Sequence, residues 1–412
     1  MNKHIFLFLT LIGSLILGNS CWGQLKTGTW QGQLKLQEQL LLPFDFEIQS
    51  DRNQQFFINN DSETIKMDVI LDTKDSLIIA FPNFNSRLHL TKNNKKTLTG
   101  FWINFNKSKD YTLNCIIRYG SKNHPIYETK STVFNEKQTL PEKWKVEFEN
   151  GTADAYQAIG LFKENESNNL SGTFATETGD YRFLSGKLFK DSLLLSCFDG
   201  AHAYLFLGKF IDTTTINGNF YSGKHWSTSW TGIVNENFEL KNPDSITYLL
   251  DSSAFHFSSY NLDSTLFSSS QHVFDNKVTV VQLMGTWCPN CMDESLYLQE
   301  LHKKYKERGL TVIGVAYEVG GSFSNYRQNI ERFKNNNNID YLITIGGGAS
   351  KDLASQQFPN LNKVSAFPTT IILDKKGNVV RIHTGFYGPS TGIYYEKYTE
   401  GMENLIIDLL SE

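Results

Sequence analysis

The stretch Gly285-Thr286-Trp287-Cys288-Pro289-Asn290-Cys291 decides the fold of the C-terminal part of the chain. It follows residues 278–284, a continuous β-branched and apolar run typical of a strand buried on both faces of a sheet. After it, apolar residues recur at helical spacing as far as Tyr305, and Lys306-Glu307-Arg308-Gly309 supplies a basic last turn and a glycine stop. We therefore expect two cysteines at the N-terminus of a helix that follows a central strand.

That placement predicts the chemistry of the two cysteines. Unpaired backbone N–H groups and the positive end of the helix dipole favour the thiolate of Cys288, and the thiolate is the attacking species in disulfide exchange. Cys291 lies one helical turn further in, where it can attack the mixed disulfide and release the partner. We therefore assign Cys288 as the nucleophile, Cys291 as the resolving thiol, and the two together as a redox-active disulfide.

A CxxC pair can also be half of a zinc site. A closed zinc site needs four ligands, and the sequence has no second CxxC pair and no HxxxH pair to complete one. Covalent haem attachment needs a histidine directly after the second cysteine, where Met292 stands. We therefore predict no metal and no organic cofactor, with the dithiol itself as the redox centre.

The WCxxC stretch together with Ala366-Phe367-Pro368-Thr369-Thr370 resembles the active site of the thioredoxin superfamily, specifically the TlpA/ResA-type envelope thiol–disulfide oxidoreductases. The resemblance implies a thioredoxin-like α/β fold, a cis bond before Pro368, and substrate binding by Trp287, Phe367 and Pro368. In that superfamily this proline faces the dithiol, and backbone groups beside it meet an extended substrate chain. Taken alone, Pro368 would fit a trans proline at the start of a strand better.

Two positions near the cysteines sharpen the resemblance. Thioredoxin itself has a buried aspartate where this chain has Gln282, whereas the TlpA/ResA-type proteins have a glutamate that Glu294 matches. Glu294 shares the apolar stripe of Cys291, which predicts burial, a raised carboxyl pKa and transfer of the resolving thiol's proton. The alternative is that Glu294 turns outward and joins Asp293 in complementing the helix dipole. Those proteins also have a proline soon afterwards; Ser295-Leu296 stands here instead, so we expect an unkinked helix.

The first residues have the pattern of a signal peptide, which we place at 1–23. Lys3 precedes an apolar run over 5–17 that is too short for a permanent membrane span. Cys21-Trp22-Gly23 offers small residues for cleavage before Gln24. The alternative is a lipid anchor at Cys21, although Gly18 stands where the bacterial lipobox has an aliphatic residue. Both alternatives predict an exported protein of the periplasm or cell envelope.

Length and composition exclude several classes of protein. The chain has 412 residues, 40% of them hydrophobic and 20% charged, which is typical of a globular protein with two or three domains. The net charge is −4 without a basic block, so no nucleic-acid partner is predicted. No second long apolar stretch follows the first, which argues against a polytopic membrane protein.

Residues 27–238 have a different character. Short alternating runs rich in aromatic residues, Leu and Thr are separated by turn residues, as in antiparallel hairpins. Three patterns recur, which predicts two related all-β halves at 24–122 and 138–238, each of about eight strands in an up-and-down barrel or sandwich. The recurrences are Lys74-Asp75-Ser76-Leu77 as Lys190-Asp191-Ser192-Leu193, Leu98-Thr99-Gly100-Phe101 as Ile216-Asn217-Gly218-Asn219-Phe220, and Trp30 as Trp144. The chain is thus predicted to be multidomain, with the thioredoxin-like domain at 244–412.

Two features of the β region leave alternatives open. Thr27-Gly28-Thr29-Trp30 resembles the Gly-x-Trp opening of calycin barrels, which implies a ligand cup, whereas the many aromatic residues fit a barrel filled by its own side chains. Cys115 and Cys197 fall in predicted strands, where they either pair outside the cytoplasm or stay as isolated buried thiols.

These observations predict an exported thiol–disulfide oxidoreductase that exchanges disulfides with envelope proteins through the WCPNC dithiol. The resemblance implies a reductase, with a membrane thiol donor or acceptor as its redox partner. The alternative is an envelope ligand- or partner-binding β protein whose redox domain is accessory or vestigial. A thiol peroxidase is disfavoured, because peroxiredoxin sites need Thr and Pro where Gly285 and Val281 stand.

Overall fold

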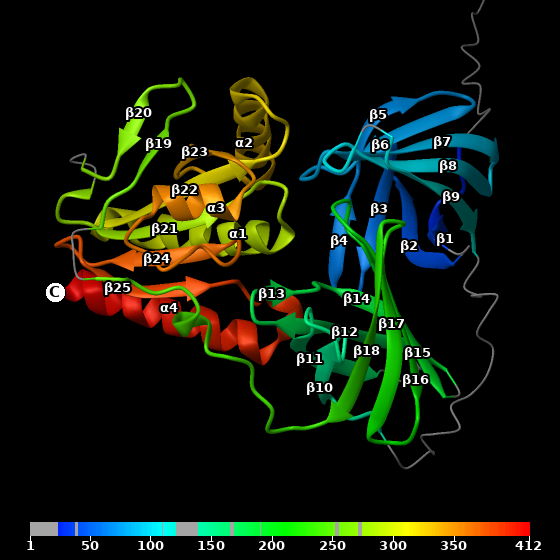
Figure 1. The fold of residues 1–412 in the computed structure, drawn as a ribbon. Helices are drawn as coiled ribbons and strands as arrows, with labels where there is room; N and C mark the ends of the chain where they lie inside the picture. The colour runs from blue at the N-terminus through cyan, green and yellow to red at the C-terminus, as the bar shows by residue number, and fades with distance from the viewer. Residues whose placement is uncertain are drawn as a thin grey trace, which may run out of the picture.

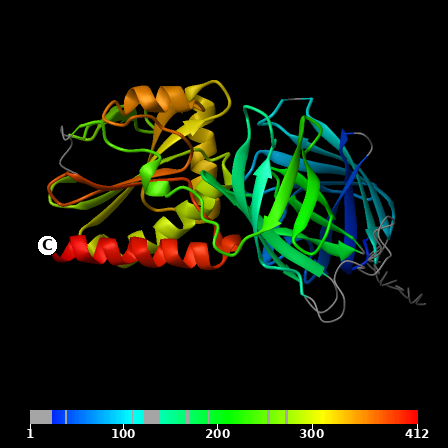
Figure 2. The same ribbon diagram turned by 60° about the horizontal axis from the view of Figure 1, so that its bottom comes forward.

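The computed structural model describes residues 24–37, 40–108, 110–120, 139–164, 169–189, 191–251, 255–270 and 274–412. The predicted signal peptide and Cys21 lie outside the described residues. Along the chain, two β bodies are followed by an α/β domain, and both β bodies lie to one side of that domain (Figures 1 and 2). We name the first two barrel 1 and barrel 2.

Barrel 1 is one nine-stranded antiparallel sheet with the order β4-β3-β2-β1-β9-β8-β7-β6-β5. Its two edge strands, β4 and β5, are consecutive in the chain and separated only by Met67, whose N–H donates to the carbonyl of Phe56 at 2.8 Å. This continuous segment therefore connects the two edges and gives the sheet its barrel-like form. The strands are β1 (Gly28–Lys35), β2 (Leu41–Ser50), β3 (Gln54–Asn60), β4 (Glu63–Lys66), β5 (Asp68–Asp72), β6 (Ser76–Ala80), β7 (Ser86–Asn94), β8 (Thr97–Asn104) and β9 (Thr112–Tyr119).

Barrel 2 is a second nine-stranded sheet with the order β11-β10-β18-β17-β16-β15-β14-β12-β13, and an additional pairing between β11 and β12 closes it. Trp30 in β1 and Trp144 in β10, which stand in matching strands of the two barrels, are both fully buried. Gly100 and Gly218 also occupy matching strands, and in each a Cβ would collide with a carbonyl of the neighbouring strand, at 1.9 and 2.3 Å. The strands are β10 (Lys143–Phe148), β11 (Tyr156–Glu164), β12 (Asn169–Thr176), β13 (Gly179–Asp180), β14 (Leu184–Phe189), β15 (Ser192–Phe198), β16 (Ala203–Phe210), β17 (Thr215–Ser222) and β18 (Trp226–Val234).

Aromatic side chains fill the interior of barrel 2. Phe206 stacks on Phe174 and Phe220 with ring centroids 4.5 and 4.2 Å apart, and Phe148 packs edge-on against Phe174. Such filling favours a packed core over a ligand cup inside this barrel. Cys197 belongs to this core and Cys115 to that of barrel 1, and both are free thiols.

Phe198, at the end of β15, joins the two barrels. Its ring packs against Phe44, Phe81 and Trp102 of barrel 1, with centroids 4.8 to 5.2 Å apart. The Asn60 side chain accepts from the Phe198 N–H at 3.0 Å and donates to its carbonyl at 3.2 Å. The barrels therefore share an apolar contact in which both backbone groups of Phe198 are hydrogen-bonded.

The α/β domain has a seven-stranded sheet with the order β20-β19-β23-β22-β21-β24-β25. Strand β21 pairs in parallel with β22 and antiparallel with β24, and all seven of its residues are buried. The elements are η2 (Pro243–Ser245), β19 (Ser258–Tyr260), β20 (Leu266–Ser268), β21 (Val278–Met284), α1 (Pro289–Tyr305), η4 (Lys306–Arg308), β22 (Leu310–Glu318), α2 (Phe323–Asn337), β23 (Leu342–Gly348), α3 (Lys351–Gln357), β24 (Thr369–Leu373), β25 (Val379–Thr384), η5 (Pro389–Thr391) and α4 (Ile393–Ser411).

Both faces of this sheet are covered by helices. Val280 of β21 shares a core with Leu298 of α1 and Met402 of α4, whereas Val281 faces the other way and shares a core with Ala354 of α3. This alternation explains why the 278–284 run is apolar throughout. Within the described residues, no helix combines the length and apolar character needed to cross a membrane.

Candidate active site around the Cys288–Cys291 dithiol

Cys288 caps the N-terminus of α1. Its Sγ accepts a hydrogen bond from the Cys291 N–H at 3.3 Å and lies 3.6 Å from the Phe367 carbonyl oxygen. The Phe367–Pro368 bond is cis, as the resemblance implies. The dithiol and the Phe-Pro motif, which are far apart in the sequence, therefore meet at the start of this helix.

The two thiols differ in accessibility. Cys288 retains 8% exposure, whereas Cys291 is fully buried. Burial raises the pKa of the Cys291 thiol well above its ordinary value, and the neighbouring Cys288 raises it further. Cys291 can therefore react only after its proton has been removed inside the protein.

Trp287 lies beside Cys288 at the protein surface. Its indole N–H donates to the Tyr317 carbonyl at 2.8 Å, and its ring meets that of Phe367 edge-on at 6.4 Å. A side chain at Gly285 would come within 2.3 Å of the indole nitrogen, so glycine is needed there. Trp287 and Phe367 thus form two sides of the opening to Cys288.

Glu294 points into the core rather than outward. Its carboxylate accepts hydrogen bonds from the Tyr398 hydroxyl at 2.7 Å, the Thr370 hydroxyl at 2.8 Å and the Gln282 amide at 2.8 Å. Burial raises the pKa of Glu294, although these hydrogen bonds oppose the shift. The Gln282 amide also donates to the Cys291 carbonyl at 3.3 Å, so it connects the carboxylate to the resolving cysteine's backbone.

Glu318, which the sequence analysis did not single out, holds the loop before Cys288. Its carboxylate accepts from the Thr286 N–H and hydroxyl, both at 2.7 Å, and from the Asn329 amide at 3.2 Å. Burial raises the pKa of Glu318. A lone carboxylate at the end of the apolar run 310–317 is the sequence signal that could have identified it.

His383 lies behind Glu294 as a hydrogen-bonded structural residue. Its Nδ1 is 2.6 Å from the carboxylate of Asp244, and its ring centroid is 4.6 Å from that of Tyr398, the residue that donates to Glu294. Because Asp244 belongs to the segment after barrel 2, that segment is attached directly to the α/β core.

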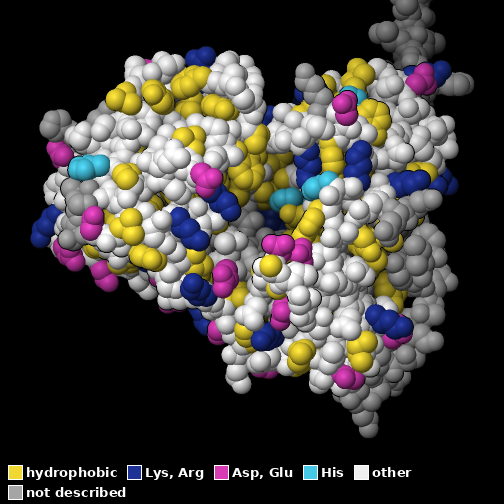
Figure 3. All heavy atoms as spheres, viewed as in Figure 1, with side chains coloured by type: hydrophobic (Ala, Val, Ile, Leu, Met, Phe, Trp, Pro, Cys, Tyr) yellow, Lys and Arg dark blue, Asp and Glu magenta, His cyan; other side chains and the backbone are white. Residues whose placement is uncertain are grey.

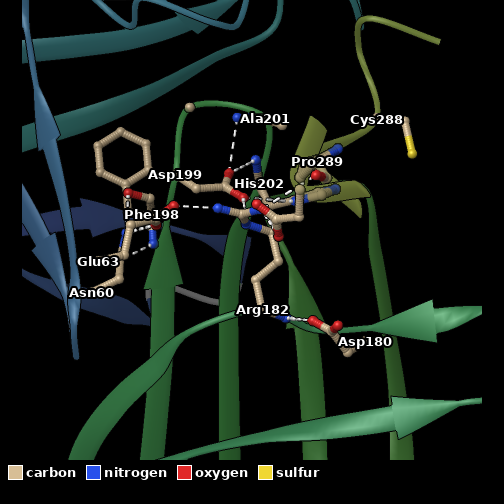
Figure 4. Close-up of polar contacts among 12 residues, drawn as sticks. Asn60, Glu63, Asp180, Arg182, Phe198, Asp199, Ala201, His202, Cys288 and Pro289 are labelled. Carbon is tan, nitrogen blue, oxygen red and sulfur yellow. Dashed lines mark hydrogen bonds and ion pairs between the residues drawn. The ribbon is translucent and has the colours of Figure 1, made fainter. Parts of the chain in front are cut away.

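Arg182 of barrel 2 reaches the segment between the two cysteines. Its guanidinium donates to the Pro289 carbonyl at 3.3 Å and forms ion pairs with Glu63, Asp199 and Asp293 (Figure 4). These carboxylates come from barrel 1, barrel 2 and α1, so one buried cation joins all three bodies. Burial raises the pKa of Asp293 to about 7, although Arg182 opposes the shift. No local sequence pattern predicted this arrangement.

The β12–β13 turn packs against the same segment. Gly179 has a φ of +150°, and a Cβ there would lie 2.5 Å from the Asn290 side-chain nitrogen. Asn290 itself donates to the Phe386 carbonyl at 3.1 Å, and the Asp180 carboxylate accepts from the Gly388 N–H at 2.5 Å. Barrel 2 therefore contacts both residues that separate the cysteines.

A cleft of about 830 Å³ lies between barrel 2 and the α/β domain. Figure 3 shows the hollow between the two parts, with hydrophobic side chains gathered in it. Cys288, Trp287 and Phe367 lie on one side of the cleft, and residues of β10, β11, the β12–β13 turn and β16 on the other. In the described part of the chain, no group of three or more His, Cys, Asp and Glu side chains is arranged to hold a metal ion.

Comparison with known protein families agrees with this geometry. Residues 248–392 match the Redoxin family. These residues form a Redoxin domain, and it is a TlpA/ResA-like member of the thioredoxin superfamily.

Relatives of this chain include two proteins named thiol-disulfide oxidoreductase ResA. The one from Geobacillus thermodenitrificans is 30% identical over 112 residues, which are 27% of this chain and 57% of the relative. The one from Halalkalibacterium halodurans is 27% identical over 116 residues, which are 27% of this chain and 56% of the relative. The chain thus spans about half the length of the curated relatives it matches.

Two solved structures are similar to a little over a third of this chain. A thioredoxin family thiol:disulfide interchange protein from Chlorobium tepidum is 22% identical, with 38% of this chain and 94% of that chain covered and a TM-score of 0.30. A thiol-disulfide oxidoreductase from Bacteroides fragilis is 17% identical, with 36% and 99% covered and a TM-score of 0.27.

Proposed function

We propose that this protein is an exported thiol–disulfide oxidoreductase that acts on disulfides of other proteins in the periplasm or cell envelope. One observation carries the proposal: Cys288 caps α1 beside the Phe367 carbonyl and keeps the more accessible thiol of the pair. The similarity of the Redoxin domain to ResA proteins supports the same reaction class.

The first step is attack by the Cys288 thiolate on one sulfur of a substrate disulfide. A bond forms between that sulfur and Cys288, and the substrate S–S bond breaks. The other substrate sulfur leaves with the electron pair and takes up a proton. The Cys291 N–H at the helix N-terminus donates a hydrogen bond to the attacking sulfur at 3.3 Å, and Trp287, Phe367 and Pro368 receive the substrate backbone.

The second step releases the substrate. Cys291 transfers its proton to the Glu294 carboxylate and attacks the Cys288 sulfur, which forms the Cys288–Cys291 disulfide. The first substrate sulfur leaves as a thiolate and is protonated. The substrate has then gained two electrons from the dithiol and two protons, which balance the one released to solvent when Cys288 ionised and the one that Cys291 passed to Glu294.

We propose that the protein works as a reductase, so a membrane thiol donor must return two electrons and two protons to the Cys288–Cys291 disulfide. No metal or organic cofactor takes part in these steps. A lipid anchor at Cys21 or a free N-terminus at Gln24 would both place the site in the envelope.

The alternative is a β protein that binds a ligand or partner, with a vestigial Redoxin domain. The filled interior of barrel 2 and its contacts with Pro289 and Asn290 favour a β region that serves the dithiol instead.

Trapping of mixed disulfides tests the proposal. The full chain carrying Cys291→Ser should accumulate mixed disulfides with envelope proteins, because attack still occurs but resolution does not. Cys288→Ser should trap almost none, and Cys115→Ser is the matched control for loss of a buried thiol. Equal trapping by Cys288→Ser would reverse the assignment, and no trapping by either variant would reject the reaction class.

A further inference from the structure

Barrel 2 presents a rigid aromatic wall to the Cys288 side of the cleft. Tyr156, Tyr181, His202 and Tyr204 all line it. The Tyr156 and Tyr181 hydroxyls are 2.8 Å apart, and His202 stacks on Tyr204 with centroids 4.3 Å apart and planes 18° apart. These contacts fix the rings before any ligand binds, so the wall is preorganised.

The charges along the same cleft are acidic. Its lining includes Glu147, Glu177 and Asp180 but no lysine or arginine. The Asp180 carboxylate already accepts hydrogen bonds from the backbone N–H groups of Gly388 and Arg182. Glu147 and Glu177 form no side-chain ion pair within the described residues, so their charges are available to a ligand.

The cleft has the size of a site for a short chain segment. A volume of about 830 Å³ falls within the usual range for ligand clefts, roughly 300–1,000 Å³, and is far too small for a folded domain. The Cys288 thiol, only 8% exposed, faces this space. A partner's disulfide must therefore enter on an extended segment that also contacts the barrel 2 wall.

We propose, on the basis of the proposed function, that barrel 2 forms half of the substrate site and selects partner segments with a basic residue beside the reacting cysteine. An arginine or lysine there would lie against the aromatic wall at Tyr156 and near the carboxylates of Glu147 and Glu177. The guanidinium or ammonium group of this residue would replace water at the aromatic rings and at the carboxylates. The β region thus supplies sequence preference, and the Redoxin domain supplies the chemistry.

Two lysines near barrel 1 would favour the opposite substrate preference, for segments with an acidic residue beside the cysteine. Lys107 and Lys224 pack over the Tyr111 ring at 5.3 and 5.2 Å, outside the residues that line the cleft. An acidic residue beside the cysteine would be attracted to them if they controlled substrate entry. The test therefore compares basic, neutral and acidic segments directly.

The experiment measures how fast the reduced full chain reduces three disulfide-linked, fluorophore-labelled peptides that differ only beside the cysteine, as Arg, Ser or Glu. We expect the Arg peptide to react about tenfold faster than the Glu peptide at low salt, with the ratio falling as salt is added. The double variant Glu147→Gln/Glu177→Gln should bring the ratio close to one. Glu236→Gln, an exposed carboxylate elsewhere on barrel 2, should leave the ratio unchanged.

The outcomes separate this inference from the proposed function. Equal rates for the three peptides, or an unchanged ratio in the double variant, would overturn the substrate preference while the oxidoreductase assignment stands. A faster Glu peptide would assign selection to Lys107 and Lys224 and also overturn it. Failure to reduce any of the peptides would instead count against the proposed function.

Discussion

The guanidinium of Arg182 donates to the carbonyl oxygen of Pro289 at 3.3 Å, so a barrel residue holds the segment between the two cysteines. The same guanidinium is paired with Glu63, Asp199 and Asp293 and is 2% exposed. A buried cation with carboxylates from three bodies makes the attachment of the Redoxin domain to the barrels an electrostatic one, and it can be tested by substitution.

Replacement of Arg182 should loosen the whole assembly. Arg182→Met leaves three carboxylates without their cation, and loss of one member of a buried ion pair costs about 3–5 kcal/mol. Arg182→Lys keeps the charge but loses the forked geometry, so its effect should be intermediate. Chemical denaturation monitored by fluorescence measures the decrease in the free energy of unfolding. Arg118→Met, at an exposed site of barrel 1, is the control, and an unfolding midpoint shared by all four proteins would contradict the role of Arg182.

Asp293 should make stability depend on pH. Its pKa is raised from 3.8 to about 7, so the folded protein holds this proton more tightly than the unfolded chain does. The contribution of Asp293 to the free energy of unfolding is therefore fully present below about pH 4 and is lost as the pH rises through about 7. The free energy of unfolding falls by at most about 1.4 kcal/mol per pH unit in this range. Asp293→Asn should flatten this part of the profile in denaturation series between about pH 4 and 8. Asp154→Asn, at an exposed site, should leave the pH profile of stability unchanged. A wild-type profile parallel to that of Asp293→Asn would refute the assignment.

Glu294→Gln should slow the release of mixed disulfides. Glutamine keeps the shape and most hydrogen bonds but cannot accept the proton of Cys291. In the wild type, release should accelerate as the pH rises through the raised pKa of Glu294, because only the carboxylate accepts that proton. Quenched-flow measurements between about pH 5 and 9 would follow the rate. Glu300→Gln, on the exposed face of α1, controls for helix effects, and identical profiles for Glu294→Gln and the wild type would eliminate the role.

Export should leave a defined N-terminus. Lys3 followed by the apolar run 5–17 predicts removal of a signal peptide, so mass spectrometry of the mature protein should find a start at Gln24 or a diacylated Cys21. Replacing Cys21 with serine distinguishes the two, since it abolishes acylation but permits cleavage before Gln24. Recovery of a cytoplasmic protein that begins at Met1 would contradict both.

The site within the Redoxin domain was largely predictable because its signals are local. The apolar run 278–284, the helical spacing after it and the Gly309 stop correspond directly to β21, α1 and a residue with φ of 104°. The burial of Glu294 followed from its place on the stripe of Cys291. The roles of these residues in catalysis stay predictions.

The contribution of the barrels could not be predicted, because it depends on contacts between distant parts of the chain. Arg182 and Gly179 stand in an ordinary hairpin sequence, and nothing near them indicates that they meet Pro289 and Asn290. The short helix α3 (Lys351–Gln357) was also missed, because seven residues carry too little periodicity to distinguish a helix from a loop.

The contacts of Arg182 also constrain the order in which the molecule can be assembled. Its partners lie at positions 63, 199 and 293, so they are synthesised in that sequence, and the barrels precede the cysteines on the ribosome. If domains fold as units in the order of their synthesis, both barrels are finished when the dithiol segment arrives. The Redoxin domain then folds against a surface that already exists, and Cys288 faces the barrel 2 side of the cleft as soon as the domain has folded.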